Sequence, residues 1–137
     1  MNDLCNKYDV QREKNWECTH VRGFEINGEI LSKCEQKLNC FPSLVQSDYL
    51  HEKCHEKADI IIANPPYVRQ ELLQPDYKQM LRKKFQEEFP DLKISVRCDL
   101  YIYFLLKAFK NLDKNGVFTF IIPNSWMDNS YGEVVRQ

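Results

Sequence analysis

The sequence lacks three features that would each assign it to a familiar class of protein. No apolar run approaches the roughly 20 residues that a membrane-spanning helix needs. None of the six cysteines forms a C-x-x-C pair of the kind found in zinc sites. The formal net charge is −1, so the positive excess of a self-sufficient DNA-binding domain is also missing. We therefore expect no membrane span, no metal site, and no complete DNA-binding surface.

The sequence also opens without a secretory signal, because residues 1–14 are polar and charged. Unpaired cysteines and the absence of a signal predict reduced thiols and a cytoplasmic location. Cys54 and His55 are adjacent, but two neighbouring side chains without a second matching pair are weak evidence for a metal. The 137 residues, 43% of them hydrophobic, fit one modest domain with one core.

What the chain contains is an alternation of apolar strands and amphipathic helices. Strands are predicted at residues 21–26, 44–46, 58–63 and 117–122, and helices from Asn27 to about residue 38 and over residues 99–112. Residues 1–20 stay unassigned, residues 68–97 are predicted to mix helix and loop, and the last residues resemble the opening of a further helix. Asn115-Gly116 is a stop and turn signal. This alternation predicts an open α/β sheet.

The clearest strand is residues 58–63, where three successive isoleucines predict burial on both faces, as in a central parallel strand. In open α/β sheets the ligand lies beyond the carboxyl ends of the strands. Polar residues lie at or just after the ends of three predicted strands: Glu25, Asp48 and Asn64. On topology alone, chemistry is expected there.

The most informative motif is Asn64-Pro65-Pro66-Tyr67, which follows the triple-isoleucine strand. The two prolines fix φ and stiffen the turn. The Asn64 side-chain oxygen and the Pro65 carbonyl are acceptors that suit one planar amine, and Tyr67 supplies a ring for stacking. Two such hydrogen bonds would favour sp3 character at the amine and free its lone pair to attack a methyl group. The alternative is a rigid turn with no function, which the position after a buried strand disfavours.

The segment ADIIIANPPYVRQE, residues 58–71, resembles the catalytic motif of amino-methyltransferases. The extension from residue 68 to 71 is similar to adenine-specific enzymes of type II and combined restriction–modification systems. Three further segments agree in order: VRGFEIN at residues 21–27, Ser47-Asp48-Tyr49, and DLYIYFLLKAFKNLDKNGVFTFIIPNSW at residues 99–126. The resemblance is to DNA methyltransferases that modify the exocyclic amine of adenine, and it covers about residues 21–137.

The resemblance implies a Rossmann-like methyltransferase sheet that binds S-adenosyl-L-methionine. Its catalytic residues would be Asn64, Pro65, Pro66 and Tyr67, and its cofactor-binding residues Glu25, Ile26, Asp48, Tyr49, Leu100 and Phe104. In this family the acidic residue after the second strand binds the cofactor ribose, and the third-strand carboxylate accepts from the cofactor's adenine amine. The target adenine leaves the duplex stack before transfer.

Each cofactor assignment has a simpler alternative. Glu25 alone is equally well a solvated strand-end carboxylate, and Asp48 alone is more often a turn residue. Leu100 and Phe104, at helical spacing, serve a core as readily as a cofactor wall.

The sequence departs from the family in one respect that matters for the cofactor. The glycine-rich loop after the family's first strand is absent, and none of the four glycines lies in such a loop. Asp3-Leu4-Cys5 stands at about the expected distance before Glu25, but no glycines follow it. We therefore expect residues 21–137 to form a partial catalytic domain, with later strands and the recognition domain elsewhere, and to associate with the remainder of the enzyme.

Two other functions compete with the adenine methyltransferase. Protein-glutamine methyltransferases acting on release factors also use Asn-Pro-Pro-Tyr, but the extension to Glu71 and the segment at residues 99–126 argue against them. A non-catalytic remnant or split subunit would keep the fold while a partner supplies the missing strand, and its open sheet edge would favour association.

Overall fold

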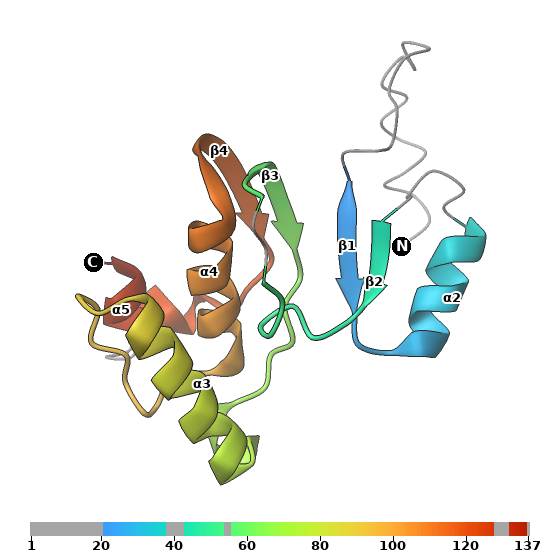
Figure 1. The fold of residues 1–137 in the computed structure, drawn as a ribbon. Helices are drawn as coiled ribbons and strands as arrows, with labels where there is room; N and C mark the ends of the chain where they lie inside the picture. The colour runs from blue at the N-terminus through green and yellow to red at the C-terminus, as the bar shows by residue number, and fades with distance from the viewer. Residues whose placement is uncertain (1–20, 38–42, 54–55, 128–131, 137) are drawn as a thin grey trace. The chain divides into compact units, whose positions relative to one another are not determined.

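The computed structural model describes residues 21–37, 43–53, 56–127 and 132–136 (Figure 1). The chain divides between His51 and Glu52 into two compact units. The first holds β1 (Arg22–Glu25), α2 (Gly28–Lys37) and β2 (Ser43–Gln46). The second holds β3 (Ala58–Ala63), the 3-10 helix η2 (Gln70–Leu72), α3 (Pro75–Glu88), α4 (Leu100–Asn111), β4 (Leu112–Phe120), the 3-10 helix η3 (Asn124–Met127) and α5 (Glu133–Arg136).

The first unit is a parallel strand–helix–strand arrangement, as predicted. β1 pairs with β2 in register from Arg22↔Ser43 to Glu25↔Gln46. Asn27 begins α2 as predicted, because its Oδ1 accepts from the amides of Glu29 at 2.9 Å and Ile30 at 3.3 Å. These bonds satisfy amides that the first turn of a helix leaves without partners.

The second unit has a parallel pair of strands with helices packed against it. β3 pairs with β4 from Ile60↔Val117 to Ala63↔Phe120. α4 packs on this pair through the rings of Phe109 and Phe118, whose centroids are 4.8 Å apart. α3 packs against α4 (Figure 1), where Phe85 meets Tyr103 edge-on at 5.2 Å. The core of this unit therefore lies between α3, α4 and one face of the sheet.

The predicted turn at Asn115-Gly116 is an interruption inside a longer strand. β4 begins at Leu112 rather than at residue 117, and the register passes from Ala58↔Leu112 to Ile60↔Val117. Residues 113–116 therefore bulge out of the ladder. Glycine fits at 116 because a Cβ there would lie 2.9 Å from the carbonyl oxygen of Ala58.

The prediction that β3 is buried on both faces is wrong for the described structure. Ile60 and Ile62 are 66% and 80% exposed. Val117 on the neighbouring strand is 62% exposed, and Ile121, directly after that strand, is 65% exposed. The reason is that α4 covers only the opposite face, on which Ile61 lies part-buried. Within the second unit, the described residues thus leave one apolar face of this sheet uncovered.

Nine of the twelve residues of α4 are buried, and one of its two lysines is among them. Lys107 is 4% exposed, and its Nζ donates to the carbonyl oxygen of Glu52 at 2.6 Å. A buried charge needs such a partner, so this bond ties the start of the second unit to its core helix. In the described part of the chain, α4 and the other helices are too short or too polar to cross a membrane.

The structure confirms a mixed α/β fold with parallel strand pairs. The complete Rossmann-like sheet stays a prediction. The segment Asp3-Leu4-Cys5 and the pair Cys54-His55 lie outside the described residues.

Candidate functional site

The Asn-Pro-Pro-Tyr loop, residues 64–67, begins where β3 ends at Ala63. Pro65 is buried, whereas Asn64, Pro66 and Tyr67 are exposed, Tyr67 to 51%. The loop is thus fixed through its first proline and presents an amide and an aromatic ring to the surface. These are the groups that the sequence assigned to amine binding and base stacking.

The Tyr67 hydroxyl connects this loop to the end of β4. Its oxygen lies 2.8 Å from Asn64 Oδ1 and 2.7 Å from the carbonyl oxygen of Ile121. Ile121 follows β4 directly, and its amide donates to the carbonyl oxygen of Ala63 at 3.1 Å. The two strand ends are therefore joined by backbone and side-chain bonds at the base of the loop.

A second connection joins the loop to the start of α4. The Leu100 amide donates to the carbonyl oxygen of Val68 at 3.0 Å. The Gln70 amide donates to Asp99 Oδ1 at 2.9 Å. Asp99 occupies the N-cap position of α4 as predicted, but its carboxylate makes no capping bond to the helix. It holds the segment after the loop instead.

In the first unit, Glu25 and Ile26 lie where β1 ends. The Glu25 side chain is part-buried, and its Oε1 accepts from the Asn27 amide at 2.8 Å. Ile26 is 69% exposed. A carboxylate beside an exposed apolar side chain offers acceptors for hydroxyl groups and a surface for a flat ring.

Asp48 and Tyr49 follow β2 at the same edge, since the Ser47 amide bonds the carbonyl oxygen of Glu25 at 3.1 Å. Asp48 Oδ1 accepts from the Leu50 amide at 2.9 Å, and its Oδ2 lies 3.7 Å from His51 Nε2. Asp48 is thus a turn residue, the simpler of the two interpretations. Its role in binding a cofactor stays a prediction.

Three further candidate residues pack within their own units. The ring of Tyr49 packs on Phe24 at a centroid distance of 5.3 Å. In the second unit, Leu100 is 8% exposed and Phe104 is part-buried, both in α4. Leu100 is therefore a core residue, and its role as a cofactor wall stays a prediction.

The structure brings the predicted residues together in two groups, one in each unit. The first holds Glu25, Ile26, Asp48 and Tyr49, and the second holds the loop at 64–67 with Leu100 and Phe104. Sequence reasoning missed two loop supports, the Ile121 carbonyl and the Asp99 carboxylate. A backbone carbonyl leaves no signal in side-chain identity. For Asp99, the capping pattern concealed its use by Gln70.

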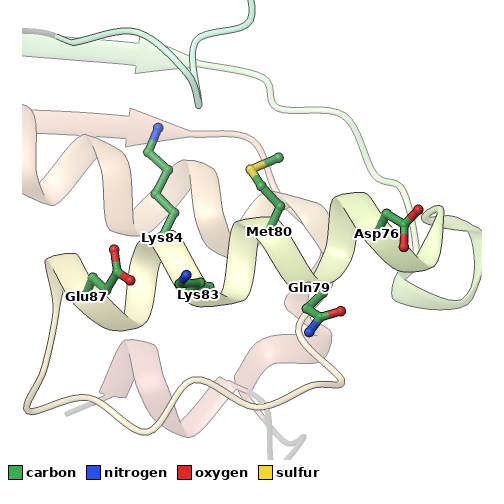
Figure 2. Close-up of a pocket in the computed structure, with 6 residues that line it drawn as sticks. All are labelled: Asp76, Gln79, Met80, Lys83, Lys84 and Glu87. Atoms are coloured by element: carbon green, nitrogen blue, oxygen red, sulfur yellow. The ribbon is translucent and has the colours of Figure 1, made fainter.

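A separate surface hollow lies along α3 and carries no functional argument. It is lined by Asp76, Gln79, Met80, Lys83, Lys84 and Glu87, all from this one helix (Figure 2). A hollow lined by one helix has no opposing wall to enclose a ligand, and none of its lining residues belongs to the loop or to α4. No group of three potential metal ligands occurs in the described segments.

Comparison with known families places these features in context. The family model described as "Eco57I restriction-modification methylase" matches residues 4–137. That range includes the loop, both strand pairs and α4.

Individual relatives are type II methyltransferases. The chain is 29% identical over 119 residues to the type II methyltransferase M.AccI of Acinetobacter calcoaceticus, covering 85% of this chain and 21% of that protein. It is 32% identical over 93 residues to M.PaeR7I of Pseudomonas aeruginosa, covering 68% and 15%. It is 39% identical over 82 residues to M.BanIII of Aneurinibacillus aneurinilyticus, covering 60% and 13%. The chain thus spans about a fifth or less of the length of these relatives.

Proposed function

Because this chain belongs to the Eco57I restriction-modification methylase family, we propose that it forms part of a DNA adenine methyltransferase. The reaction would transfer the methyl group of S-adenosyl-L-methionine to the exocyclic amine of adenine. The observation that carries the proposal is the loop at 64–67, which exposes Asn64 and Tyr67 on a support made by β4 and α4. We further propose that both units belong to one catalytic domain covering residues 21–137.

The chemistry asked of the loop is to hold one amine. The Asn64 side-chain oxygen and the Pro65 carbonyl would accept hydrogen bonds from its two N–H groups, which draws the nitrogen toward sp3 geometry. The nitrogen lone pair would then attack the methyl carbon as the methyl–sulfur bond breaks, its electron pair would stay on sulfur to leave a neutral thioether, and the proton lost afterwards would pass to solvent. Positioning of the two reactants accounts for much of the acceleration in such a step.

Tyr67 would stack on the flipped adenine. Its half-exposed ring is anchored at the hydroxyl, so the ring is already oriented before the base arrives. Stacking of a base on an aromatic side chain contributes about 1–3 kcal/mol. The net charge of −1 indicates that phosphate contacts would come mainly from a recognition domain or partner.

The residues at the ends of β1 and β2 fit the cofactor chemically. Glu25 would accept from the ribose hydroxyls, Ile26 would pack on the adenine ring, and Asp48 would accept from its amine. When bound, S-adenosyl-L-methionine supplies an activated methyl group on a sulfonium. Tyr49 is proposed as a neighbour of the same ligand, and a cofactor role for Leu100 and Phe104 is proposed from the family resemblance alone.

The first test is calorimetric titration of the purified chain with S-adenosyl-L-methionine. Glu25→Ala is expected to weaken binding about 10-fold or more, because a hydrogen bond to a charged group contributes about 1.5–3 kcal/mol. Asp48→Ala should act in the same direction. Glu29→Ala, an exposed carboxylate in the first turn of α2, is the matched control and should bind like the unaltered chain. Loss of affinity in the control, or none in Glu25→Ala, contradicts the assignment.

The second test addresses the base. Binding of an oligonucleotide carrying an unpaired adenine should weaken about 5- to 150-fold in Tyr67→Ala, the range that lost stacking predicts. Met80→Ala, 37% exposed in the α3 hollow, is the control and should bind unchanged. Equal binding by both variants would remove the loop from base recognition.

A further inference from the structure

The Tyr67 hydroxyl lies between two atoms that both accept hydrogen bonds. Its oxygen is 2.8 Å from Asn64 Oδ1 and 2.7 Å from the Ile121 carbonyl oxygen. A phenol has one proton to donate. With both neighbours acting as acceptors, one of the two short contacts would be an oxygen–oxygen repulsion.

Only one of these neighbours can change its character. Ile121 offers a backbone carbonyl, which accepts and never donates. Asn64 offers a carboxamide, whose oxygen and nitrogen exchange places by a half-turn about the last side-chain bond, and the hydrogen-bond network decides between the two orientations. Both contacts are attractive only if the phenol donates to Ile121 and the Asn64 NH2 donates to the phenol oxygen.

We propose that the Tyr67 hydroxyl is a positioning group that selects the orientation of the Asn64 carboxamide, turning its oxygen toward the substrate amine. This inference rests on the proposed function, because it assumes that an amine is the ligand. In the selected orientation the exposed Asn64 side chain presents an acceptor outward. In the opposite orientation its NH2 would face the substrate NH2, donor against donor.

The hydroxyl thus acts beyond stacking. Its bond to Ile121 fixes the phenol oxygen at the end of β4, and its lone pair holds the Asn64 nitrogen. Phenylalanine at position 67 would keep the ring but would no longer select one orientation of the Asn64 carboxamide. The Asn64 amide would then turn freely between a productive and an unproductive state.

The orientation itself is measured without any ligand. The chain labelled with 15N-asparagine is examined by NMR, and the Asn64 side-chain signal is identified by its loss in Asn64→Asp. Strong NOEs between the Asn64 NH2 protons and the Tyr67 ring protons beside the hydroxyl are expected, because the NH2 faces the phenol. Absence of these NOEs means that the carboxamide oxygen faces the phenol, which overturns the proposal.

The consequence for recognition is measured with adenosine and with purine riboside, which lacks the amine. The unaltered chain is expected to prefer adenosine about 3- to 10-fold, the value of one or two net hydrogen bonds. Tyr67→Phe should abolish this preference. In the Asn64→Asp background both side-chain oxygens accept, no orientation needs selecting, and Tyr67→Phe should leave the preference unchanged.

The outcomes separate the explanations. An adenosine preference that survives Tyr67→Phe, or that falls equally in both backgrounds, overturns the positioning role, since equal loss indicates a merely structural one. If the unaltered chain does not distinguish the two nucleosides, the proposed amine recognition fails for this chain, and the NOEs alone decide the orientation of Asn64.

Discussion

The turn after β2 and the loop after β3 both follow a parallel strand at its carboxyl end, yet they are held in different ways. Asp48 Oδ1 accepts from the amide of Leu50, two residues away. Tyr67 reaches Ile121, 54 residues along the chain, and Asp99 reaches Gln70 across 29 residues. The β2 turn is therefore set locally, whereas the β3 loop depends on the core around it. A group that must hold a reacting amine gains precision from such support.

The helices that support the β2 turn and the β3 loop also differ in how much they bury. Among the described residues α2 buries only Leu31, while α4 buries nine side chains. Those nine are Leu100, Tyr101, Ile102, Tyr103, Leu105, Leu106, Lys107, Ala108 and Asn111. The second unit thus has the core that its loop requires, and four predictions test how far this asymmetry extends.

The largest effect is expected from Phe85→Ala in α3. Phe85 is fully buried against Tyr103 and Phe89, so its removal should lower the free energy of unfolding by about 3–5 kcal/mol. Leu31→Ala in α2 should cost about 2 kcal/mol. Denaturant titrations of the two variants measure the difference. Equal costs would show that the first unit is packed as firmly as the second.

The next effect concerns alkaline pH. Burial raises the pKa of the Cys98 thiol to about 11, and burial also raises the pKa of Tyr103. Below the ordinary thiol pKa, the Cys98 thiol is protonated in both the folded and the unfolded chain, and the free energy of unfolding has its full value. As pH rises toward 11 the unfolded chain loses its proton while the folded chain keeps it, so stability falls, by at most about 3 kcal/mol. Cys98→Ala should show a shallower loss of stability between pH 9 and 11.

Asp99→Ala removes the carboxylate that holds Gln70, and the expected loss of stability is about 1–2 kcal/mol. Asp99→Asn keeps an acceptor oxygen and should lose less. Hydrogen exchange of the Gln70 amide, which the carboxylate protects, should accelerate in Asp99→Ala. The matched change in the other segment, Asp48→Ala, should accelerate exchange at Leu50 alone. If Asp48→Ala accelerated hydrogen exchange at many amides, the β2 turn would also depend on distant contacts, and the contrast with the β3 loop would be wrong.

The difference between the segments also explains what could be predicted from sequence. The order of the strands, the helices α2 and α4 and the Asn27 cap follow from local chemistry, and they were predicted. The helix α3 was predicted only as part of a mixture of helix and loop, and the turn predicted at Asn115-Gly116 is an irregularity inside β4. The supports of the β3 loop depend on which distant backbone meets it. No spacing within residues 64–67 indicates that Ile121 would face Tyr67.

The prediction that β3 is buried on both faces is the clearest error. Three isoleucines in a row favour a strand covered on both faces, but the apolar pattern of a strand does not show whether a covering element is present. The candidate cofactor residues Glu25 and Asp48 were placed correctly at strand ends, because a strand's last residue follows from its apolar run. Their partners, the Asn27 and Leu50 amides, are also local.

The smallest effect is expected on the open face of β3. Ile62 is 80% exposed, so Ile62→Thr should change the free energy of unfolding by no more than about 0.5 kcal/mol. Ile61, its neighbour, lies part-buried on the face that α4 covers, and Ile61→Thr should cost about 1 kcal/mol or more. The two substitutions are chemically identical and adjacent, so strand propensity cancels and only burial differs. A cost for Ile62→Thr that matched the cost for Ile61→Thr would mean that this face is covered in solution. If that cost depended on protein concentration, the cover would be a second copy of the chain, and if it did not, the cover would be a segment of the chain itself.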